Sequence, residues 1–286
     1  MRSSWLVSLI APAALVATLP ACEDHTKEQA QAAGYVLDKL VPVANEDAAQ
    51  VRRGLPEGAK KLGEVVDTDP GANLVALQKA VRGARASVKD LDIAKSTFFT
   101  FVDTTGIALR SEADPDLLAQ KSVLSSFPAL KKGLEPSAGL VEAWGEMQEM
   151  RGVRTGPDTQ WVAAHPVKDK EGQVKGMFVT GWSFRRFALR LEEMAKRELL
   201  DRAEREKQNK IPIVYVFLVR EGKAYGAPVT PDVNAQAVEG LDLVNKTQSG
   251  PYRGSLEITN RSYGIAAQRV PDLGEGTILS VIASAI

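Results

Sequence analysis

Two stretches of the sequence repeat each other without gaps, and this repeat limits the possible folds more than any other feature. At a constant offset of 116 residues, seven of the twenty positions from 101 to 120 are identical in the two copies. Average residue frequencies give roughly one or two such identities by chance. The matched positions are Phe101 and Phe217, Gly106 and Gly222, Ala108 and Ala224, Pro115-Asp116 and Pro231-Asp232, and Ala119-Gln120 and Ala235-Gln236. The 286-residue chain is therefore expected to contain two domains of similar architecture.

Each copy is predicted to begin with a β-hairpin. Residues 98–102 are aromatic and β-branched, Asp103-Thr104-Thr105-Gly106 is a turn signal, and residues 107–110 resume as a strand. Pro115 and Pro231 each follow an acidic or hydroxyl residue and predict the start of a helix. The other predicted strands are residues 160–167, 176–182, 211–219, 256–259, 263–270 and 277–283. Consecutive strands of this kind form antiparallel sheets, so the predicted fold class is α+β.

The later strands of the two halves show a weaker similarity with an offset of its own. Ala163-Ala164 matches Ala266-Ala267 at an offset of 103, and Val167 and Asp169 match Val270 and Asp272. The middle of the second copy is therefore expected to be shorter than that of the first. Each half is predicted to contain strand, turn, strand, short helix and then a late pair of strands.

Two long helices are predicted outside the repeated hairpins. The first begins with Asp69 as N-cap and Pro70 in the first turn, and its apolar stripe extends from Leu74 to Leu91 in steps of three and four. This stripe fits a helix packed along the domain, or alternatively a coiled-coil dimer. The second helix is capped by Ser183 and runs to about Asn209, with four i,i+4 acid–base pairs. Its charge run indicates a solvated face on a helix that connects the domains.

The N-terminus has the pattern of an export signal. Arg2 precedes an apolar run from Trp5 to Leu19, too short and too interrupted for a membrane span. Leu19-Pro20-Ala21-Cys22 then resembles a bacterial lipobox, in which Cys22 is lipidated and becomes the first mature residue. The alternative is an ordinary signal peptide with an incidental cysteine. A lipid-anchored protein facing the periplasm is expected, with the inner or outer membrane left open.

Composition excludes several functional classes. The 36 basic and 36 acidic residues cancel, whereas nucleic-acid-binding proteins usually carry a basic excess. A single cysteine excludes a disulfide framework within the chain, and two histidines leave little material for a metal centre. No catalytic serine motif or metal-binding loop is present, so neither an enzyme nor a cofactor is expected.

The order of elements resembles tandem Cache domains, which are PAS-like extracytoplasmic sensor domains of bacteria. The segment from Phe99 to Leu134 carries the resemblance, together with residues 176–182 and the amphipathic helix after them. The resemblance implies two PAS-like antiparallel-sheet domains with a long N-terminal helix and a connecting helix. The expected organisation is a signal peptide and lipobox (1–22), a tether with short helices (23–69), a long helix, first domain and connecting helix (70–209), and a second domain (210–286).

Residues 139–161 form the longest stretch unique to the first half, which is therefore the expected ligand-binding half. Arginine suits carboxylates because its planar fork donates two parallel hydrogen bonds, and tryptophan offers a stacking surface. Trp161 and His165 share one face of a strand, where they either line a pocket or belong to the core. The arginines of this stretch are either ligand-binding or solvent-facing. The candidate ligand-binding residues are Arg110, Trp144, Arg151, Arg154, Trp161 and His165.

The predicted function is that of a sensory or accessory lipoprotein that binds a small ligand such as a carboxylate or an amino acid. A signal would then pass through an envelope protein partner or through occupancy alone. The alternative is an envelope scaffolding or assembly lipoprotein with PAS-like interaction modules and no ligand. A hollow first domain with converging polar groups favours the first function, whereas a filled first domain and a conspicuous apolar surface favour the second.

Overall fold

The computed structural model describes residues 21–66, 69–151 and 156–284. The predicted signal sequence before Ala21 and the side chain of Cys22 lie outside the described residues. The helices are α1 (Ala21–Val65), α2 (Leu74–Ala86), α3 (Lys89–Ile93), α4 (Val123–Ser126), η1 (Pro128–Leu134), α5 (Gln148–Arg151), α6 (Phe184–Glu206), α7 (Asp232–Glu239), α8 (Leu243–Lys246) and η2 (Pro271–Leu273). Within these ranges, no helix combines the length and apolarity needed to cross a bilayer.

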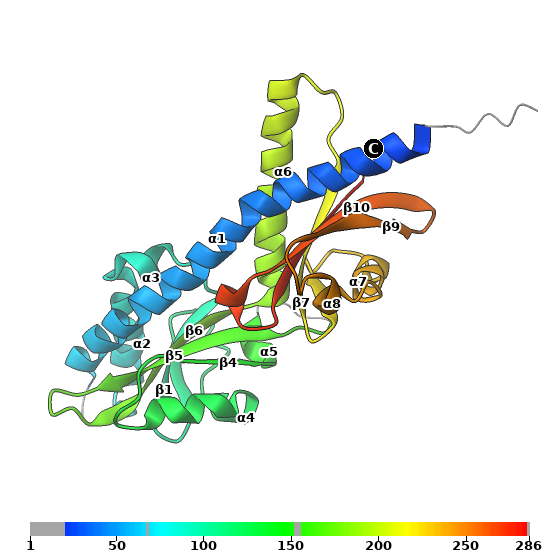
Figure 1. Cartoon of the computed structure of the whole chain (residues 1–286). Coiled ribbons are helices and arrows are strands. Elements are labelled where there is room, and N and C mark those ends of the chain that lie inside the picture. Colours follow the sequence, from blue (N-terminus) through cyan, green and yellow to red (C-terminus); the bar gives the residue numbers. More distant parts are fainter. Residues whose placement is uncertain (1–20, 67–68, 152–155, 285–286) are drawn as a thin grey trace, which may run out of the picture.

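The strands form two antiparallel sheets. They are β1 (Phe98–Asp103), β2 (Ile107–Ser111), β3 (Lys121–Ser122), β4 (Val141–Gly145), β5 (Gln160–Lys168), β6 (Val174–Ser183), β7 (Ile213–Arg220), β8 (Lys223–Gly226), β9 (Tyr252–Ile258), β10 (Arg261–Arg269) and β11 (Ile278–Ser284). The first sheet has the order β3-β2-β1-β6-β5-β4 and the second β8-β7-β11-β10-β9, so the two orders correspond once β3 is set aside. The predicted α+β class with two PAS-like sheets is confirmed (Figure 1).

The hairpins of the repeat pair in the same way at the repeated phenylalanines, although the first hairpin alone has a register shift between Phe101 and Val102. Phe101 on β1 pairs with Arg110 on β2, and Phe217 on β7 pairs with Gly226 on β8. The two partners, Arg110 and Gly226, are 116 residues apart, as Phe101 and Phe217 are. The sequence repeat is therefore a structural repeat at this point.

The predicted offset of 103 for the later strands is wrong by one residue. Opposite the repeated phenylalanines lie Phe178 on β6 and Ser280 on β11, which are 102 residues apart. Phe178 pairs in turn with His165, and Ser280 with Ala267, again 102 apart. Since side chains alternate between faces, a one-residue shift would exchange the two faces of a strand. At an offset of 102 Ala164 still matches Ala266 but Ala163 meets Ile265, so residue identity alone favours the offset that the strand pairing does not have.

Residues 21–65 form one helix rather than the predicted tether with short helices. Pro42 and Pro56 lie inside α1, where an interior proline usually costs about 3 kcal/mol. The helix forms because one face is buried along its whole length, and each fully buried large apolar side chain contributes about 1.5–3 kcal/mol. The buried residues are Ala33, Val36, Leu37, Leu40, Ala44, Ala48, Val51, Leu55, Ala59 and Leu62.

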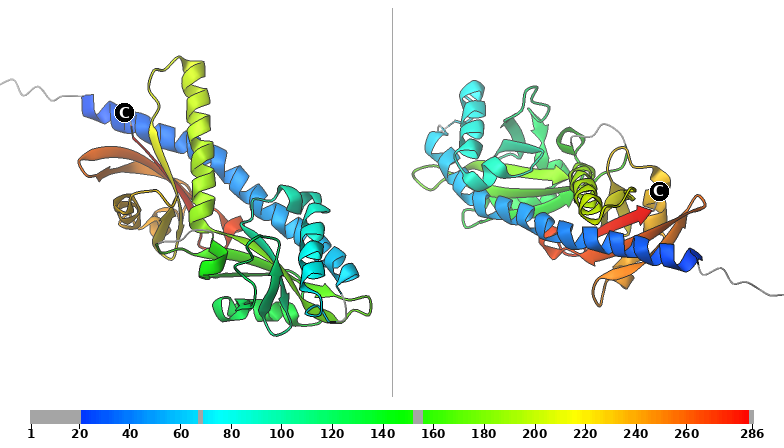
Figure 2. Two further views of the ribbon diagram at one scale, coloured as in Figure 1. Left: turned by 180° about the vertical axis from the view of Figure 1, so that it is seen from behind. Right: turned by 90° about the horizontal axis from the view of Figure 1, so that it is seen from above.

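Both sheets pack on α1, which lies along the whole molecule (Figure 2). At the second sheet, a Cβ added to Gly264 on β10 would overlap the backbone nitrogen of Ala30. At the first sheet, a Cβ added to Gly63 would overlap the carbonyl oxygen of Lys168 on β5. Helix and sheet backbones are thus in direct contact at both ends, so α1 holds the two sheets in one arrangement.

The helix that was predicted to begin at Asp69 and to reach Leu91 begins at Leu74 and ends at Ala86 in the structure. Asn73, not Asp69, caps α2, because its side chain accepts from the backbone nitrogen of Ala76 at 3.0 Å. The Asp69 side chain instead accepts from the nitrogen of Gly71 at 2.9 Å, which forms a turn ahead of the helix. The apolar stripe is buried, but the helix breaks at Ser87. Its face packs on α1, β1 and β2, which excludes the coiled-coil alternative for that face.

The helix predicted after Asp114 does not form in the first copy. Asp116 instead accepts hydrogen bonds from Ser111 Oγ at 2.6 Å and from the backbone nitrogen of Ser111 at 2.8 Å. A side chain bonded in this way competes with helix formation and favours a turn. In the second copy the predicted helix is present as α7.

The connecting helix α6 confirms its predicted cap. Ser183 Oγ accepts from the backbone nitrogen of Arg186 at 3.0 Å, and the helix ends at Glu206. Its charged residues are mainly exposed, except for Glu192, which is buried and accepts from Lys196 at 2.7 Å. The helix leads from β6 of the first sheet to β7 of the second.

Candidate functional site

The face of the first sheet that lies away from α1 is filled. Apolar side chains from β1, β4, β5 and β6 pack there against α4, η1 and α5. The largest of them include Phe98, Phe127, Leu130, Met147 and Met177. On this face the first half is therefore filled with core residues rather than hollow.

The two candidates on β5 face α1 rather than this filled side. Trp161 is fully buried, and its Nε1 donates to Glu142 Oε2 at 2.9 Å, while its ring contacts Trp182 at a tilt of 37° with centroids 4.3 Å apart. His165 is half-buried, with its Nδ1 3.1 Å from the carbonyl oxygen of Pro166. Burial lowers the pKa of His165 below its usual value, so the neutral form predominates at neutral pH.

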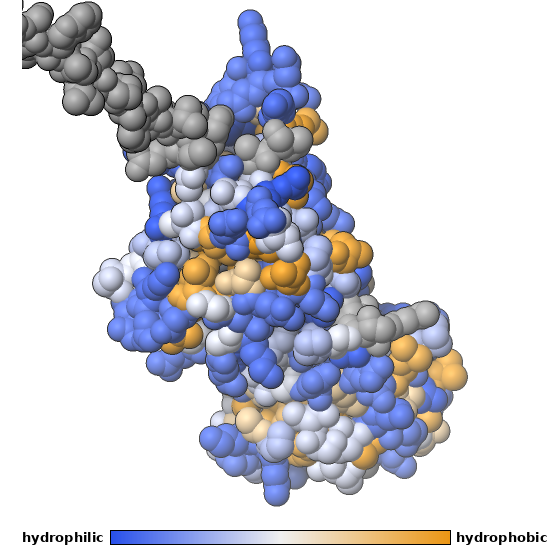
Figure 3. All heavy atoms as spheres, turned by 90° about the vertical axis from the view of Figure 1, so that its right-hand side faces the viewer, coloured by the Kyte–Doolittle hydropathy of each residue, from blue (hydrophilic) through white to orange (hydrophobic). Residues whose placement is uncertain are grey.

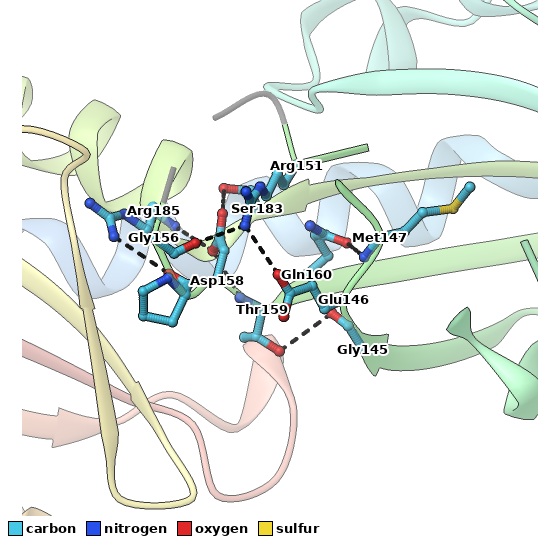
Figure 4. Close-up of polar contacts among 11 residues, drawn as sticks. Gly145, Glu146, Met147, Arg151, Gly156, Asp158, Thr159, Gln160, Ser183 and Arg185 are labelled. Atoms are coloured by element: carbon cyan, nitrogen blue, oxygen red, sulfur yellow. Dashed lines mark hydrogen bonds and ion pairs between the residues drawn. The ribbon is translucent and has the colours of Figure 1, made fainter. Parts of the chain in front are cut away.

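Arg151 is held at the end of α5 by a polar network within residues 139–161 (Figure 4). Its Nη1 donates to Glu146 Oε1 at 3.0 Å and to the carbonyl oxygen of Gly156 at 2.7 Å. The residue is only 5% exposed. Arg154 lies outside the described residues. Arg151 therefore links the end of α5 to Gly156, which lies shortly before the start of β5.

Asp158 joins this segment to the start of α6 (Figure 4). Its Oδ2 accepts from Ser183 Oγ at 2.6 Å, and its Oδ1 accepts from the backbone nitrogens of Thr159 at 2.8 Å and Arg185 at 3.2 Å. The carboxyl is deeply buried, and burial raises its pKa above the usual value even though these donors favour the charged form. The network fixes the first turn of α6 and with it the side chain of Arg185.

Arg185 extends from α6 to the second domain. Its Nη2 donates to the carbonyl oxygen of Pro228, in the connection from β8 to α7, at 3.2 Å, and its Nη1 lies 3.5 Å from that of Pro157. Gly156 has φ of +83°, and a Cβ there would overlap Arg185 Nη1. Glycine at 156 therefore permits both the turn and the close approach of the guanidinium.

A pocket of about 260 Å³ opens beside Arg185, between Pro157, which precedes β5 of the first sheet, and β8 and α7 at the second sheet. We refer to it as the junction pocket. Two of its buried polar atoms, Arg185 Nε and Thr230 Oγ1, have no hydrogen-bond partner among the described residues. Burial raises the pKa of the Tyr225 phenol, so this group stays protonated at neutral pH. The polar lining residues are Arg185, Tyr225, Thr230, Asp232, Gln236 and Glu239.

Trp144 also lies at the junction of the domains. The guanidinium of Arg220 on β7 lies over its ring, 4.5 Å from the centroid, and a Cβ on Gly274 would overlap the ring. Arg110 is half-buried on β2, and its Nη1 donates to the carbonyl oxygen of Leu109 at 2.8 Å. Of the described candidates, Trp144 and Arg151 thus lie in segments that contact or order the junction, and the others do not converge with them.

Sequence reasoning missed the residues that line the junction pocket. Arg185 was one of many charged residues on a helix, and Thr230 was only part of a helix-start signal. Nothing in their local patterns distinguishes them, since the pocket brings together residues 157–239 from both domains. In the described part of the chain, no group of His, Cys, Asp and Glu side chains is arranged to hold a metal ion.

Comparison with solved structures identifies the fold. A scan against protein-family models found no match. A search of curated proteins also found none. A domain of a sensory box/GGDEF family protein from Vibrio parahaemolyticus superposes with a TM-score of 0.54 at 13% identity, covering 92% of this chain and 97% of that one. A methyl-accepting chemotaxis protein X superposes at 0.52 and 13% identity, covering 92% and 100%.

An extracellular ligand binding receptor from Desulfohalobium retbaense superposes with a TM-score of 0.53 at 11% identity. The match covers 88% of this chain, which spans only 40% of the length of that receptor. These neighbours are a domain of a sensory box protein, a chemotaxis protein and an extracellular receptor, so the predicted Cache-like, PAS-like fold is confirmed. At these identities the similarity establishes the fold alone.

Proposed function

We propose that this chain is an extracytoplasmic sensory binding protein that takes a small ligand into the junction pocket. The observation that carries the proposal is the pair of buried, unpartnered polar atoms there, Arg185 Nε and Thr230 Oγ1. Buried polar groups in folded proteins almost always have a hydrogen-bond partner, and a ligand would supply one for both. In this proposal the first domain comprises residues 70–209 and the second residues 210–286.

The lining of the junction pocket suits a zwitterion such as an amino acid. Arg185 supplies a permanent positive charge and a free donor for a carboxylate, and Asp232 supplies a negative charge for an ammonium group. The protonated Tyr225 adds a further donor. A volume of about 260 Å³ is at the small end for ligand pockets, which favours a compact molecule.

The position of the pocket explains how occupancy would be sensed. Arg185 belongs to the helix that follows the first sheet, whereas Thr230 and Asp232 belong to the second domain. A ligand that contacts both sides favours arrangements in which the two sides are close, and so shifts the population of domain arrangements. Since no span was found within the described residues, the proposed route of the signal is an envelope protein partner.

The proposal includes a lipid anchor on Cys22. Processing at the lipobox would leave Cys22 as the first residue, next to the start of α1 at Ala21. The helix that holds both sheets would then begin at the membrane surface with no flexible tether. Acyl chains of this kind anchor a protein without a spanning helix.

The Cys22→Ser variant is expected to lose lipid attachment completely. A serine hydroxyl cannot replace the thiol that lipobox enzymes modify, so labelled palmitate should enter the wild-type protein and not the variant. The variant should also leave the membrane fraction after cell fractionation. Palmitate incorporation into Cys22→Ser would show that the anchor lies elsewhere, and an unlabelled wild-type protein would favour an ordinary signal peptide.

The scaffolding alternative makes a different prediction for the surface. On the face shown in Figure 3, hydrophilic residues predominate and apolar residues form small separate groups. Among the described residues, the exposed large apolar side chains are Val65, Val75, Ile93, Leu117, Leu200, Val229 and Val233, which are spread along the chain. This distribution gives little support to a large interaction patch, whereas the filled face of the first sheet is the feature that favours the scaffolding function.

A thermal-shift screen tests the proposed function. The chain from residue 23 onward is screened against amino acids, organic acids, polyamines and nucleosides, and an amino acid is expected to raise the melting temperature. A ligand at one hundred times its dissociation constant stabilises the fold by about 2.7 kcal/mol. Loss of the Arg185 contact should weaken binding by roughly tenfold or more, because hydrogen bonds to charged groups contribute about 1.5–3 kcal/mol.

The variants of this screen are chosen to separate binding from folding. Arg185→Ala and Asp232→Asn should both lose the shift, whereas Arg197→Ala, which removes an exposed arginine of the same helix, should retain it. Arg151→Ala tests the ordering network next to the pocket. A hit that survives Arg185→Ala and Asp232→Asn would place the site elsewhere, and no hit in the panel would favour the scaffolding function.

A further inference from the structure

A second cleft lies on the α1-facing side of the first sheet and shares no lining residue with the junction pocket. It has a volume of about 460 Å³ and is bounded by the end of α2, residues 92–97 and the first turns of α6. We refer to it as the basic cleft, because four of its lining residues are Arg85, Lys95, Arg186 and Arg190. Neither the repeat nor the proposed function accounts for this concentration of cations.

Three buried polar atoms of the basic cleft lack partners among the described residues. They are Trp182 Nε1, Arg85 Nε and Ser96 Oγ. Trp182 is completely buried. Indole and guanidinium nitrogens only donate hydrogen bonds and the serine hydroxyl can donate as well, so acceptor oxygens are the kind of partner that all three atoms lack.

Two of the cations already have carboxylate partners. Arg85 Nη1 donates to both oxygens of Glu112 at 2.8 Å, and Arg190 forms an ion pair with Asp47. These pairs fix the two guanidinium groups, since each remaining N–H then has a set direction. They also neutralise the two charges, so any excess must come from the other cations.

The other two cations supply that excess. Neither Lys95 nor Arg186 forms an ion pair with a carboxylate of the described residues, and Lys95 interacts with Asp47 only at longer range. Both side chains are exposed, and Asp92 is the acidic residue that shares the lining with them. With the two internal pairs set aside, two positive charges therefore face one negative charge.

The wall of the basic cleft is rigid. Trp182 and Phe187 stack with ring centroids 4.7 Å apart and an angle of 13°, and Trp161 lies against the other side of Trp182. Arg190 lies over Phe187 at 5.8 Å from the centroid. Donors held on such a wall lose little conformational freedom on binding, which favours affinity.

We propose that the basic cleft binds an oxyanion, either a carboxylate or a phosphate group of a small molecule. The donors Trp182 Nε1, Arg85 Nε and Ser96 Oγ contact its oxygens, and Lys95 and Arg186 balance its charge. The site uses none of the residues that line the junction pocket, so it stands whether or not that pocket takes a ligand.

Isothermal titration calorimetry tests this site, with succinate and inorganic phosphate as probes at an ionic strength held constant with chloride. At least one probe is expected to bind saturably with one site per chain. Binding of phosphate alone identifies a phosphate site, and binding of succinate alone a carboxylate site. If neither succinate nor phosphate gives a binding signal above that of chloride at the same ionic strength, the proposal is overturned. Water would then be the partner of Trp182 Nε1, Arg85 Nε and Ser96 Oγ.

The variants identify the groups responsible. The double variant Lys95→Ala/Arg186→Ala removes two exposed cations and should weaken binding at least tenfold, whereas Lys131→Ala/Lys132→Ala removes two exposed cations from η1 and should not. Trp182→Phe keeps most of the aromatic surface and removes the donor, so it should also weaken binding. Equal affinity in the Lys95→Ala/Arg186→Ala variant and the wild type would overturn the assignment.

Discussion

The Gly264→Ala variant is expected to lose about 3 kcal/mol of unfolding free energy. A Cβ at this position of β10 would overlap the backbone of α1 at Gln29 and Ala30, not a side chain that can move away. Overpacking a close contact usually costs about 1–3 kcal/mol, and displacement of a helix that also packs on the first sheet places this change at the upper end. Urea unfolding followed by circular dichroism measures the loss.

Gly83→Ala is the matched control for this substitution. A Cβ at Gly83, in the interior of α2, meets nothing within 4 Å. Alanine there should raise stability by about 0.5–1 kcal/mol, because glycine is a poor helix former. If Gly264→Ala unfolds at the same urea concentration as the wild type, α1 does not lie against β10 as described.

The Asp158→Ala variant is expected to lose a similar amount, about 3 kcal/mol. The change removes the acceptor for Ser183 Oγ and for the backbone nitrogens of Thr159 and Arg185. Each buried donor left without a partner costs about 1–3 kcal/mol. Water that enters the space can accept from some of the three donors, so the total loss is smaller than three separate penalties. Thermal and urea unfolding measure the loss, and an unchanged stability would contradict the described network.

Asp158 also gives a pH dependence with a defined sign. Burial raises the pKa of the folded carboxyl above the usual 3.8, so the folded state binds this proton more readily than the unfolded state. The stabilising contribution of the protonated group is complete below the unfolded pKa and is lost as pH rises through the folded pKa. Asp158→Asn cannot titrate, so the stability of the wild type relative to this variant should fall as the pH rises above the unfolded pKa of about 4. A difference that rises with pH would show that the hydrogen bonds outweigh burial.

The hairpins of the fold were predictable because their signals are local. Gly106 and Gly222 both close turns at positive φ, and the strands on either side have aromatic and β-branched residues. The long helix α1 was not predictable in the same way. Pro42 and Pro56 are local signals against a helix, whereas the burial of its apolar face depends on two sheets distant in sequence.

The candidate site was predicted in part. The segment 139–161 does lead to the junction of the domains, and Arg151 does belong to its polar network. Trp161 and His165 do lie on the same face of β5, but α1 packs along that face. The lining residues Arg185 and Thr230 come from different domains, so only the tertiary structure brings them together.

A crystal structure of the chain grown with the strongest amino-acid hit from the thermal-shift screen decides whether the junction pocket is the ligand site. We expect density for the ligand in the junction pocket, with acceptor atoms within hydrogen-bond distance of Arg185 Nε and Thr230 Oγ1. Density for the ligand elsewhere, with an empty junction pocket, would overturn the proposed function.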